Sequence, residues 1–525
     1  MVLTPEQIFQ AFDEAEQTLP VANWTIGDLR VWPIVRNYHA YLLCTQKAFD
    51  RNNEIAAAGT QITTRLRQIA KTCIEHAVCV VRDRVSNDVL RPTDVLIAAH
   101  SSTRYFQVEG RWYNPYSDSV TRHLRKQNLD ALVLEFTGDG KYLAPRFNKS
   151  IYVQARSFLI SVRAKLASKM TYARLPETLD GWDEFLALLD RRLGPGCRPS
   201  LDSVRFRAHQ VLGYERWVSK MIARTAPKVG IVTGYYSTDM MGFVRAFRKA
   251  SLLSVEIQHG VQGTQHFAYR KWNRIPLGGY DTLPEVFWSW SKTESDYINS
   301  WAAASGGGHR AVVGGNPCLH IYDHQGRDYR HEVKGTTGTG QSKAADVNVL
   351  FTAQAFNQLP QCVLDAMHAT PEWKWWIRTH PQYVEAAQSI RKICRAFPNV
   401  VVEEADSLPL GVLLNHCDVH VTEFSSSVLE SKAKGVRSVI VNPIGIELFK
   451  DLIASGEVLF VDQSAELVRG IVQQAAQCRR PAALASADDC FFSDVMTEIV
   501  RAAVGTRQVG PLPADQVVTG GARVH

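Results

Sequence analysis

The 525-residue sequence lacks several features that would place it in a simple class. It has no run of about 18 uninterrupted apolar residues, and its start shows no basic segment followed by an apolar stretch. Its ten cysteines form no Cys-x-x-Cys pair and no His/Cys cluster at zinc spacing, so neither a disulfide framework nor a structural metal is indicated. We therefore expect a cytoplasmic protein with reduced cysteines in its core.

Familiar nucleotide-binding and metal-binding motifs are also missing. Gly314-Gly315 is not a dinucleotide-binding fingerprint, and no Gly-x-x-x-x-Gly-Lys-[Ser/Thr] sequence occurs, which argues against ordinary dehydrogenases and P-loop kinases. No Asp-x-Asp element stands at a credible metal site. The composition is that of a globular protein, with 45% apolar and 21% charged residues, and the length suits two or three domains.

The net charge of +7 is concentrated in residues 147–228, where Lys and Arg outnumber Asp and Glu by about two to one. Basic side chains there alternate with apolar ones such as Phe158, Leu159, Trp182 and Trp217. This pattern suits peripheral contact with an anionic membrane, and it also suits a solvated face on ordinary amphipathic helices. No nucleic-acid recognition motif accompanies the charge, so we expect no nucleic-acid partner.

The second half of the chain alternates regularly between strand-like and helix-like segments. Residues 335–342 are small and polar and predict a domain boundary. Beyond them, strands are predicted at 347–352, 373–379, 400–403, 418–422, 436–441 and 458–461. Helices are predicted at 358–369, 384–396, 407–416, 426–434, 445–455 and 464–477. Such alternation requires parallel strands joined by crossover helices, which predicts a Rossmann-like domain over residues 345–505 and a loose tail at 506–525.

The first half has fewer strand signals. Strands are predicted at 94–99, 131–135, 229–233 and 254–257. The mostly helical segment at about 150–225 interrupts them and carries the basic surface. We therefore predict an α/β domain over residues 1–334 with a helical basic insertion, facing the second domain across a cleft lined by the carboxyl ends of both sheets.

Three motifs lie where a strand-like run ends and a helix-like pattern begins: Gln258-His259-Gly260, His380-Pro381, and Glu423 with the serine run at 425–427. The carboxyl ends of parallel strands collect ligands and catalytic groups. The serines are predicted to cap a helix and to expose backbone N–H groups to a phosphate, with capping alone as the alternative.

His259 is the main candidate for acid–base chemistry. Gly260 lets a ligand approach closely, and an imidazole with a pKa near neutrality suits a general base or a phosphate contact. The alternative is that His259 only closes a turn. Asp239, after the strand at 229–233, is the nearest candidate carboxylate for base or nucleophile work, with Asp118 and Glu135 as rivals.

These motifs resemble those of the GT-B glycosyltransferases of bacterial surface-polysaccharide assembly, including transferases of CMP-activated acidic sugars and the related CDP-glycerol glycerophosphotransferases. The segments at 24–36 and 111–118 look similar to parts of capsule and O-antigen transferases. The resemblance implies a GT-B-like fold, metal-independent transfer without a cofactor, and contact between His380 and the donor phosphate, where the imidazole would stabilise charge on the leaving nucleotide.

The resulting hypothesis is a glycosyltransferase that moves a sugar from a nucleotide-activated donor to a glycan or lipid-linked acceptor. The preferred donor is a CMP-linked acidic sugar such as 3-deoxy-manno-octulosonic acid. The predicted catalytic residues are His259, Asp239 and His380. The predicted donor-binding residues are His380, Glu423, Ser425, Ser426 and Ser427. The alternatives are a UDP-sugar 2-epimerase of the same fold and a non-catalytic scaffold of a polysaccharide-export complex. A peripheral position at the inner face of the cytoplasmic membrane is part of the hypothesis.

Overall fold

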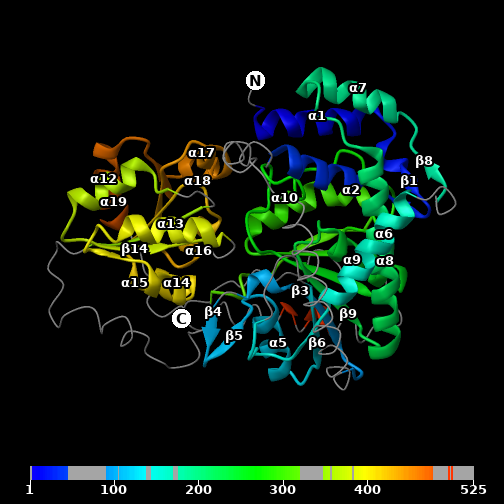
Figure 1. Cartoon of the computed structure of the whole chain (residues 1–525), viewed down its shortest axis with the longest axis horizontal. Helices are drawn as coiled ribbons and strands as arrows, with labels where there is room; N and C mark the ends of the chain where they lie inside the picture. The colour runs from blue at the N-terminus through cyan, green and yellow to red at the C-terminus, as the bar shows by residue number, and fades with distance from the viewer. Residues whose placement is uncertain are drawn as a thin grey trace, which may run out of the picture.

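The described part of the chain forms two lobes, each built on its own parallel sheet (Figure 1). The computed structural model describes residues 3–44, 90–104, 106–136, 143–169, 175–319, 347–354, 358–380, 383–476, 495–496 and 498–500. The predicted linker at 335–342, the predicted tail at 506–525 and Pro381 lie outside the described residues.

The N-terminal domain contains a seven-stranded sheet in the order β12-β11-β10-β9-β3-β6-β7, in which every neighbouring pair is parallel. Its strands are β3 (Val95–His100), β6 (Ala131–Phe136), β7 (Ser150–Tyr152), β9 (Val229–Thr233), β10 (Leu253–Ile257), β11 (Val286–Ser289) and β12 (Arg310–Val313). The four predicted strands are confirmed as β3, β6, β9 and β10. Most strand residues are buried, as expected for a sheet that is covered on both faces.

The C-terminal domain contains a six-stranded parallel sheet in the order β15-β14-β13-β16-β17-β18. Counted from β13, this order is 3-2-1-4-5-6, the strand order of a dinucleotide-binding Rossmann domain. Its strands are β13 (Asn348–Thr352), β14 (Lys374–Arg378), β15 (Val400–Val401), β16 (Val419–Thr422), β17 (Arg437–Ile440) and β18 (Val458–Phe460). All six were predicted, because each is a short apolar run between two helix-like segments.

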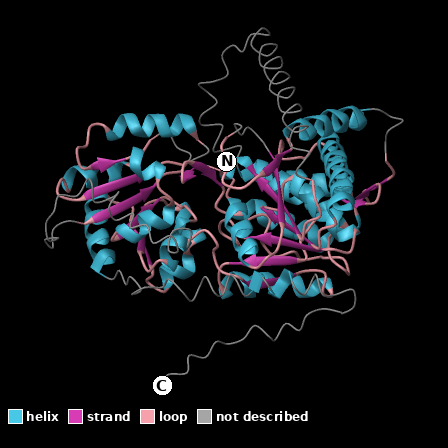
Figure 2. Ribbon diagram, turned by 90° about the horizontal axis from the view of Figure 1, so that it is seen from below, coloured by secondary structure: helices cyan, strands magenta, loops and turns pink. Residues whose placement is uncertain are grey.

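Helices pack on the sheets of both domains (Figure 2). In the N-terminal domain they include α5 (Ser117–Lys126), α9 (Thr238–Lys249) and α10 (Lys292–Ala302). In the C-terminal domain they are α12 (Gln361–Ala369), α13 (Val384–Cys394), α14 (Glu403–Ser407), α15 (Leu410–His416), α16 (Ser427–Ala433), α17 (Ile444–Leu448), α18 (Lys450–Ala454) and α19 (Ser464–Ala476). The predicted fold class, α/β with two Rossmann-like domains, is confirmed.

The predicted helical insertion lies between β7 and β9 and consists mainly of α6 (Gln154–Lys169), α7 (Trp182–Leu193) and α8 (Leu201–Thr225). The helix α8 packs on α9, and α6 packs on α8. The N-terminal segment adds α1 (Pro5–Thr18), α2 (Trp32–Ile34), β1 (Thr25–Ile26) and β2 (Leu29–Arg30). The short strands β1 and β2 form an antiparallel sheet with β8 (Glu177–Thr178), and β4 (Phe106–Val108) pairs with β5 (Arg111–Tyr113).

The last described residues return to the N-terminal domain. Met496, Ile499 and Val500 belong to the same buried cluster as side chains of β3, β6 and β9. The range of 345–505 predicted for the C-terminal domain is therefore corrected at its end, because these side chains cover the N-terminal sheet. An apolar helix-like pattern indicates burial, but it does not say which sheet is covered.

Two other properties of the described residues bear on the sequence analysis. None of the described helices is long and apolar enough to cross a membrane. The cysteines within the described ranges are free, and Cys362, Cys394 and Cys417 are buried, as predicted for core thiols. Burial raises the pKa of the Cys394 thiol to about 12, which keeps it protonated and unreactive.

Candidate functional site

His259 lies directly after β10, at the carboxyl end of the N-terminal sheet. The Tyr236 hydroxyl oxygen lies 3.1 Å from His259 Nε2, and the Tyr116 hydroxyl donates to the His259 carbonyl oxygen at 3.0 Å. His259 Nδ1 is buried and has no hydrogen-bond partner among the described residues. Burial, together with nearby His100, lowers the pKa of His259 to about 4. The imidazole is therefore neutral near pH 7 and has one unpaired ring nitrogen.

A buried carboxyl group that the sequence reasoning missed, that of Glu256, lies three residues before His259. Glu256 in β10 accepts a hydrogen bond from the Tyr235 backbone N–H at 3.2 Å and another from the Tyr269 hydroxyl. Burial raises the pKa of Glu256 to about 8, although these hydrogen bonds lower it. The carboxyl group is thus mostly protonated near pH 7. An acidic residue inside an otherwise apolar strand was the available signal.

Two further histidines surround the same site. His100 ends β3, and His266 lies in the loop after β10. Burial, with a contribution from His259, lowers the pKa of His266 to about 3. The Tyr236 ring centroid lies 5.3 Å from that of His266 and 6.0 Å from that of His259. The ends of β3, β9 and β10 thus form one site lined by aromatic rings and histidines.

The long loop between β10 and β11 is held at its start and near its middle. Gln258, fully buried, donates from its amide to the Gly260 carbonyl oxygen at 2.8 Å, and its Oε1 accepts from the Trp290 backbone N–H at 2.5 Å. Further along, Arg36 donates to the carbonyl oxygens of Arg270 and Lys271 at 3.1 and 2.8 Å. Loops of this length without secondary structure are commonly functional, and here the N-terminal segment fixes the loop over the sheet.

The serine run follows β16 and leads into α16, with Ser426 as the N-cap residue. The buried Ser427 hydroxyl lies 2.9 Å from Thr352 Oγ1 and 3.1 Å from His420 Nε2. Ser425 Oγ accepts from the Ser427 backbone N–H at 3.3 Å. Ser427 therefore ties α16 to the sheet, while the partly exposed Ser425 and Ser426 are better placed to meet a ligand. Sequence reasoning treated the three serines as equivalent because their partners come from distant strands.

Two glutamates beside the serine run have perturbed acidity. Burial raises the pKa of Glu423 to about 7, with a smaller opposite effect of the hydrogen bond from Asn442, whose Nδ2 lies 3.2 Å from Oε1. Burial also raises the pKa of Glu430, on α16, to about 7, while Arg378 and Asn316 lower it. Asn316 belongs to the N-terminal domain, so Glu430 lies at the domain boundary. Glu430 was not singled out from the sequence.

His380 lies just beyond the end of β14, at the edge of the C-terminal sheet where β13 and β16 also end. Burial and nearby Arg378 lower the pKa of His380 to about 4, and its ring centroid lies 4.7 Å from that of Tyr383. Thr379, which precedes His380, donates a hydrogen bond from its backbone N–H to Asp406 Oδ1 at 2.7 Å. The histidine is thus neutral in the free protein and sits on a fixed strand end.

The turn after β10 in the N-terminal domain and the serine run of the C-terminal domain approach each other across the domain boundary. A Cβ atom built on Gly260 would lie 3.7 Å from the Ser426 hydroxyl oxygen, so the turn after β10 faces the start of α16. The next residue, Val261, packs against the buried cluster that contains Val428 and Ile440 of the C-terminal domain. His380 reaches the same sheet edge from β14, and Arg378 is coupled electrostatically to Glu430 on α16.

The candidate carboxylates of the N-terminal domain are engaged elsewhere. Asp239 lies in the first turn of α9, where its Oδ1 accepts from the Met240 backbone N–H at 2.9 Å and from the Ser237 hydroxyl. These local hydrogen bonds are those of a carboxylate that stabilises a helix start. Its catalytic role stays a prediction.

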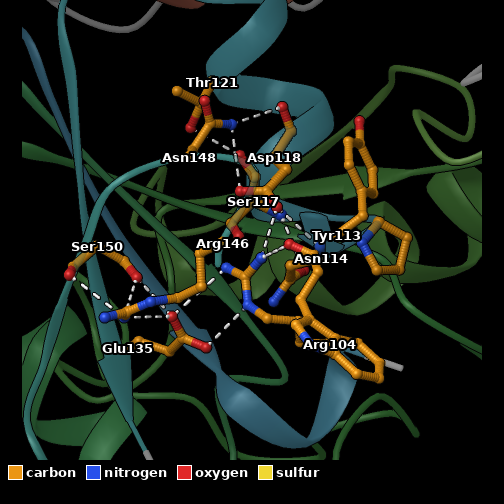
Figure 3. Close-up of polar contacts among 12 residues, drawn as sticks. Arg104, Tyr113, Asn114, Ser117, Asp118, Thr121, Glu135, Arg146, Asn148 and Ser150 are labelled. Carbon is orange, nitrogen blue, oxygen red and sulfur yellow. Dashed lines mark hydrogen bonds and ion pairs between the residues drawn. The ribbon is translucent and has the colours of Figure 1, made fainter. Parts of the chain in front are cut away.

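Asp118 and Glu135 belong to a buried ion network (Figure 3). Arg104 donates to Asp118 Oδ2 at 2.8 Å and to Glu135 Oε1 at 3.0 Å, and Arg146 donates to Glu135 Oε2 at 3.2 Å. The network also fixes the turn that carries Tyr116, since Asp118 accepts from the Asn114 backbone N–H at 2.8 Å. These two carboxylates therefore position the partner of His259.

A cavity of about 500 Å³ lies between the domains, beside the loop after β10. The N-terminal domain lines it with Gln262, Trp290 and Tyr297, among others. The C-terminal domain lines it with residues of α16, α17 and α18, including Lys432, and with Phe449 between α17 and α18. Gln262 Nε2 and Trp290 Nε1 are buried without a hydrogen-bond partner among the described residues. Such unpaired donors are costly unless a ligand or water supplies acceptor oxygens.

Comparisons with known proteins give similarity at the level of fold. No family model matches the sequence, and no curated protein matches it. The UDP-GlcNAc 2-epimerase from Neisseria meningitidis bound to UDP-GlcNAc is 12% identical, with a TM-score of 0.45 over 77% of this chain and 100% of that chain. The UDP-GlcNAc 2-epimerase from Methanocaldococcus jannaschii is 9% identical, with a TM-score of 0.44 over 77% and 99%. The calicheamicin glycosyltransferase CalG4 is 12% identical, with a TM-score of 0.41 over 80% and 100%. At these values the likeness supports no conclusion about substrate or reaction.

Proposed function

We propose that the protein is a glycosyltransferase that moves a sugar from a nucleotide-activated donor to a glycan or lipid-linked acceptor in bacterial cell-surface polysaccharide synthesis. The observation that carries this proposal is the meeting of the His259–Gly260 turn with Ser426 across the domain boundary, next to a cavity that both domains line. Transfer between two bound molecules requires them to be held in line, and a cleft between two Rossmann-like domains provides this.

In this proposal the C-terminal domain holds the donor. The phosphate is contacted by the hydroxyl groups of Ser425 and Ser426 and by the imidazole of His380. Ser427 holds the start of α16 against the sheet through its hydrogen bonds with Thr352 and His420. A phosphate bound beside His380 raises the pKa of that imidazole, which favours a charge-assisted hydrogen bond to the leaving nucleotide. Glu423, with its pKa of about 7, can donate a hydrogen bond while protonated or accept one while ionised.

His259 is proposed to handle the acceptor. The acceptor hydroxyl oxygen attacks the anomeric carbon, the bond between that carbon and the phosphate oxygen breaks, and the nucleotide leaves with the electron pair. The hydroxyl proton passes to the unpaired Nδ1 of His259, which is neutral near pH 7 and therefore free to accept it. Asp239 remains the alternative base. The proposal includes metal-independent transfer without a cofactor.

A CMP-linked acidic sugar is the proposed donor class. Its support is the pair of unpaired N–H groups on Gln262 and Trp290, which fit the hydroxyl and carboxylate oxygens of a sugar. Lys432 lines the same cavity from the C-terminal domain. The rings of Tyr297 and Phe449 offer apolar surface for the C–H faces of a sugar. A lipid-linked acceptor would place the enzyme at a membrane, so peripheral contact through residues 147–228 belongs to the same proposal.

The test is nucleotide release from CMP-, CDP-, UDP- and GDP-linked sugars, with and without acceptor glycan. A transferase releases nucleotide only with acceptor, an epimerase converts its donor alone, and a scaffold does neither. In the active combination, His380→Ala should lower turnover by about 100- to 1000-fold, the usual effect of losing a group that stabilises developing charge. The matched control is His368→Ala, an exposed histidine of the same domain, which should leave turnover unchanged. Wild-type rates for His380→Ala would refute its role.

A further inference from the structure

The helix α6 is apolar on two opposite faces. One face packs on α8, where a Cβ atom built on Gly213 would lie only 2.7 Å from Ile160 Cγ2, so glycine is what allows the two helices to approach so closely. Ala164 and Ser168 are buried on the same side. This side accounts for only part of the apolar surface of the helix.

The opposite side of α6 exposes a second apolar stripe. Leu159 is 42% exposed, Val162 39% and Leu166 54%, and the 3.6-residue period of the helix aligns them, roughly opposite Ile160. Phe158, 37% exposed, lies on the same side. Large apolar side chains with this exposure are few in the described chain, and four of the nine are on this one helix. Such a concentration marks an interaction surface, whereas single exposed apolar residues do not.

Basic side chains border the stripe. The helical period puts Lys165 on one border and Arg156 and Arg163 on the other, with Lys169 at the end, and all four are exposed. The helix contains no acidic residue. On the neighbouring α8, three exposed cations follow one another at intervals of four residues: Arg216, Lys220 and Arg224. Figure 1 shows the two helices side by side on the outer edge of the N-terminal lobe.

The structure also removes part of the membrane surface expected from the sequence. Tyr214 and Met221 of α8 are buried, and Trp182 and Trp217 pack against the core of the N-terminal domain. These side chains are turned inward and are unavailable to a lipid. Among the described residues of the basic region 147–228, the exposed large apolar side chains all lie on α6.

We propose that this outer face of α6, with the cations of α8 beside it, docks the protein on the surface of an anionic lipid bilayer. The helix lies in the plane of the membrane, Leu159, Val162 and Leu166 enter the interface, and the flanking cations meet lipid phosphates. The complete lack of acidic groups on the helix favours an anionic partner, and the apolar stripe between the cations favours a bilayer over a purely polar polyanion. The inference rests on the proposed function, since a lipid-linked acceptor lies in a membrane and the enzyme has to reach it there.

The experiment is flotation of the full-length protein with vesicles of phosphatidylcholine alone and with vesicles that also contain phosphatidylglycerol. We expect binding to the anionic vesicles only, weakened by high salt. Arg163→Gln/Lys165→Gln should reduce binding about 25-fold, at about fivefold for each cation. Leu159→Gln/Leu166→Gln should reduce it roughly tenfold for each leucine, because each loses apolar contact with the bilayer.

Matched controls distinguish binding through this surface from nonspecific binding through exposed apolar or basic residues elsewhere. Leu277→Gln removes a leucine that is 86% exposed but lies outside α6, and Arg469→Gln removes an exposed cation of the C-terminal domain. Both should bind vesicles like the wild type. Equal binding by the stripe variant and the wild type would overturn the inference, as would tight binding to RNA without binding to vesicles.

Failure of the docking and failure of the proposed function give different results. The α6 variants should keep the wild-type rate of nucleotide release with a water-soluble acceptor glycan. A protein that binds vesicles through α6 but transfers no sugar would retain the docking and refute the proposed function. A protein that transfers sugar while its α6 variants bind vesicles like the wild type would retain the proposed function and refute the docking.

Discussion

Replacing Glu256 by glutamine should make the stability of the protein less dependent on pH. The carboxyl group has an ordinary pKa of 4.5 in an unfolded chain and a pKa of about 8 in the folded protein, because it is buried. Between these values the unfolded chain releases the proton while the folded protein keeps it. The free energy of unfolding therefore falls as the pH rises from about 4.5 to about 8 and levels off above that.

The size of the effect follows from the two pKa values. At about 1.4 kcal/mol for each pH unit, the interval corresponds to about 5 kcal/mol for a group that is completely buried. Glutamine has no ionisation and removes this slope. However, Glu256 Oε2 has no hydrogen-bond partner among the described residues, so an amide there should cost about 1–3 kcal/mol at every pH. The variant should be less stable than the wild type near pH 5 and more stable near pH 8.

The assay is urea unfolding followed by tryptophan fluorescence across this pH range, with midpoints compared between proteins because a two-domain chain need not unfold in one step. The two midpoint curves should cross. Glu372→Gln, at an exposed position, is the control and should run parallel to the wild type. Parallel curves for Glu256→Gln and the wild type would show that the carboxyl group is ionised in the folded protein and would refute the reasoning.

Two further substitutions test the packing around the site. Gly234 has φ +70°, and a Cβ atom there would lie 3.3 Å from His259 Cε1, so Gly234→Ala should cost about 1–2 kcal/mol of unfolding free energy and lower turnover by displacing the imidazole. Gly263→Ala, with open space around its Cβ position, should leave the unfolding free energy unchanged. Asp118→Asn removes one of the charges opposite buried Arg104 and should lower the free energy of unfolding by about 3 kcal/mol in urea titrations. Loss of the exposed Arg91–Asp130 ion pair through Arg91→Ala should cost less than about 1 kcal/mol. Equal losses for the buried and the exposed pair would contradict the role given to burial.

The site was predicted only as far as local patterns allow. The turn at His259 and the serine run were found because each follows an apolar strand-like run, which is a feature of neighbouring residues. The same signal could not separate Ser427, whose hydroxyl contacts Thr352 and His420, from Ser425 and Ser426. Hydrogen-bond partners on other strands depend on the order of strands in the sheet, and local sequence patterns do not specify that order.

By itself, the sequence determined the alternation of strands and helices, the α/β class and the concentration of basic residues in the insertion, because these depend on spacing and composition over short stretches. The tertiary structure decided which side of each element is covered. It buried one apolar face of α6 against Gly213 and left the face with Leu159 and Leu166 in water, and it placed Gly260 opposite Ser426. The physical reason is that burial depends on contacts between segments far apart in the chain, whereas periodicity records only that some face of a segment is apolar.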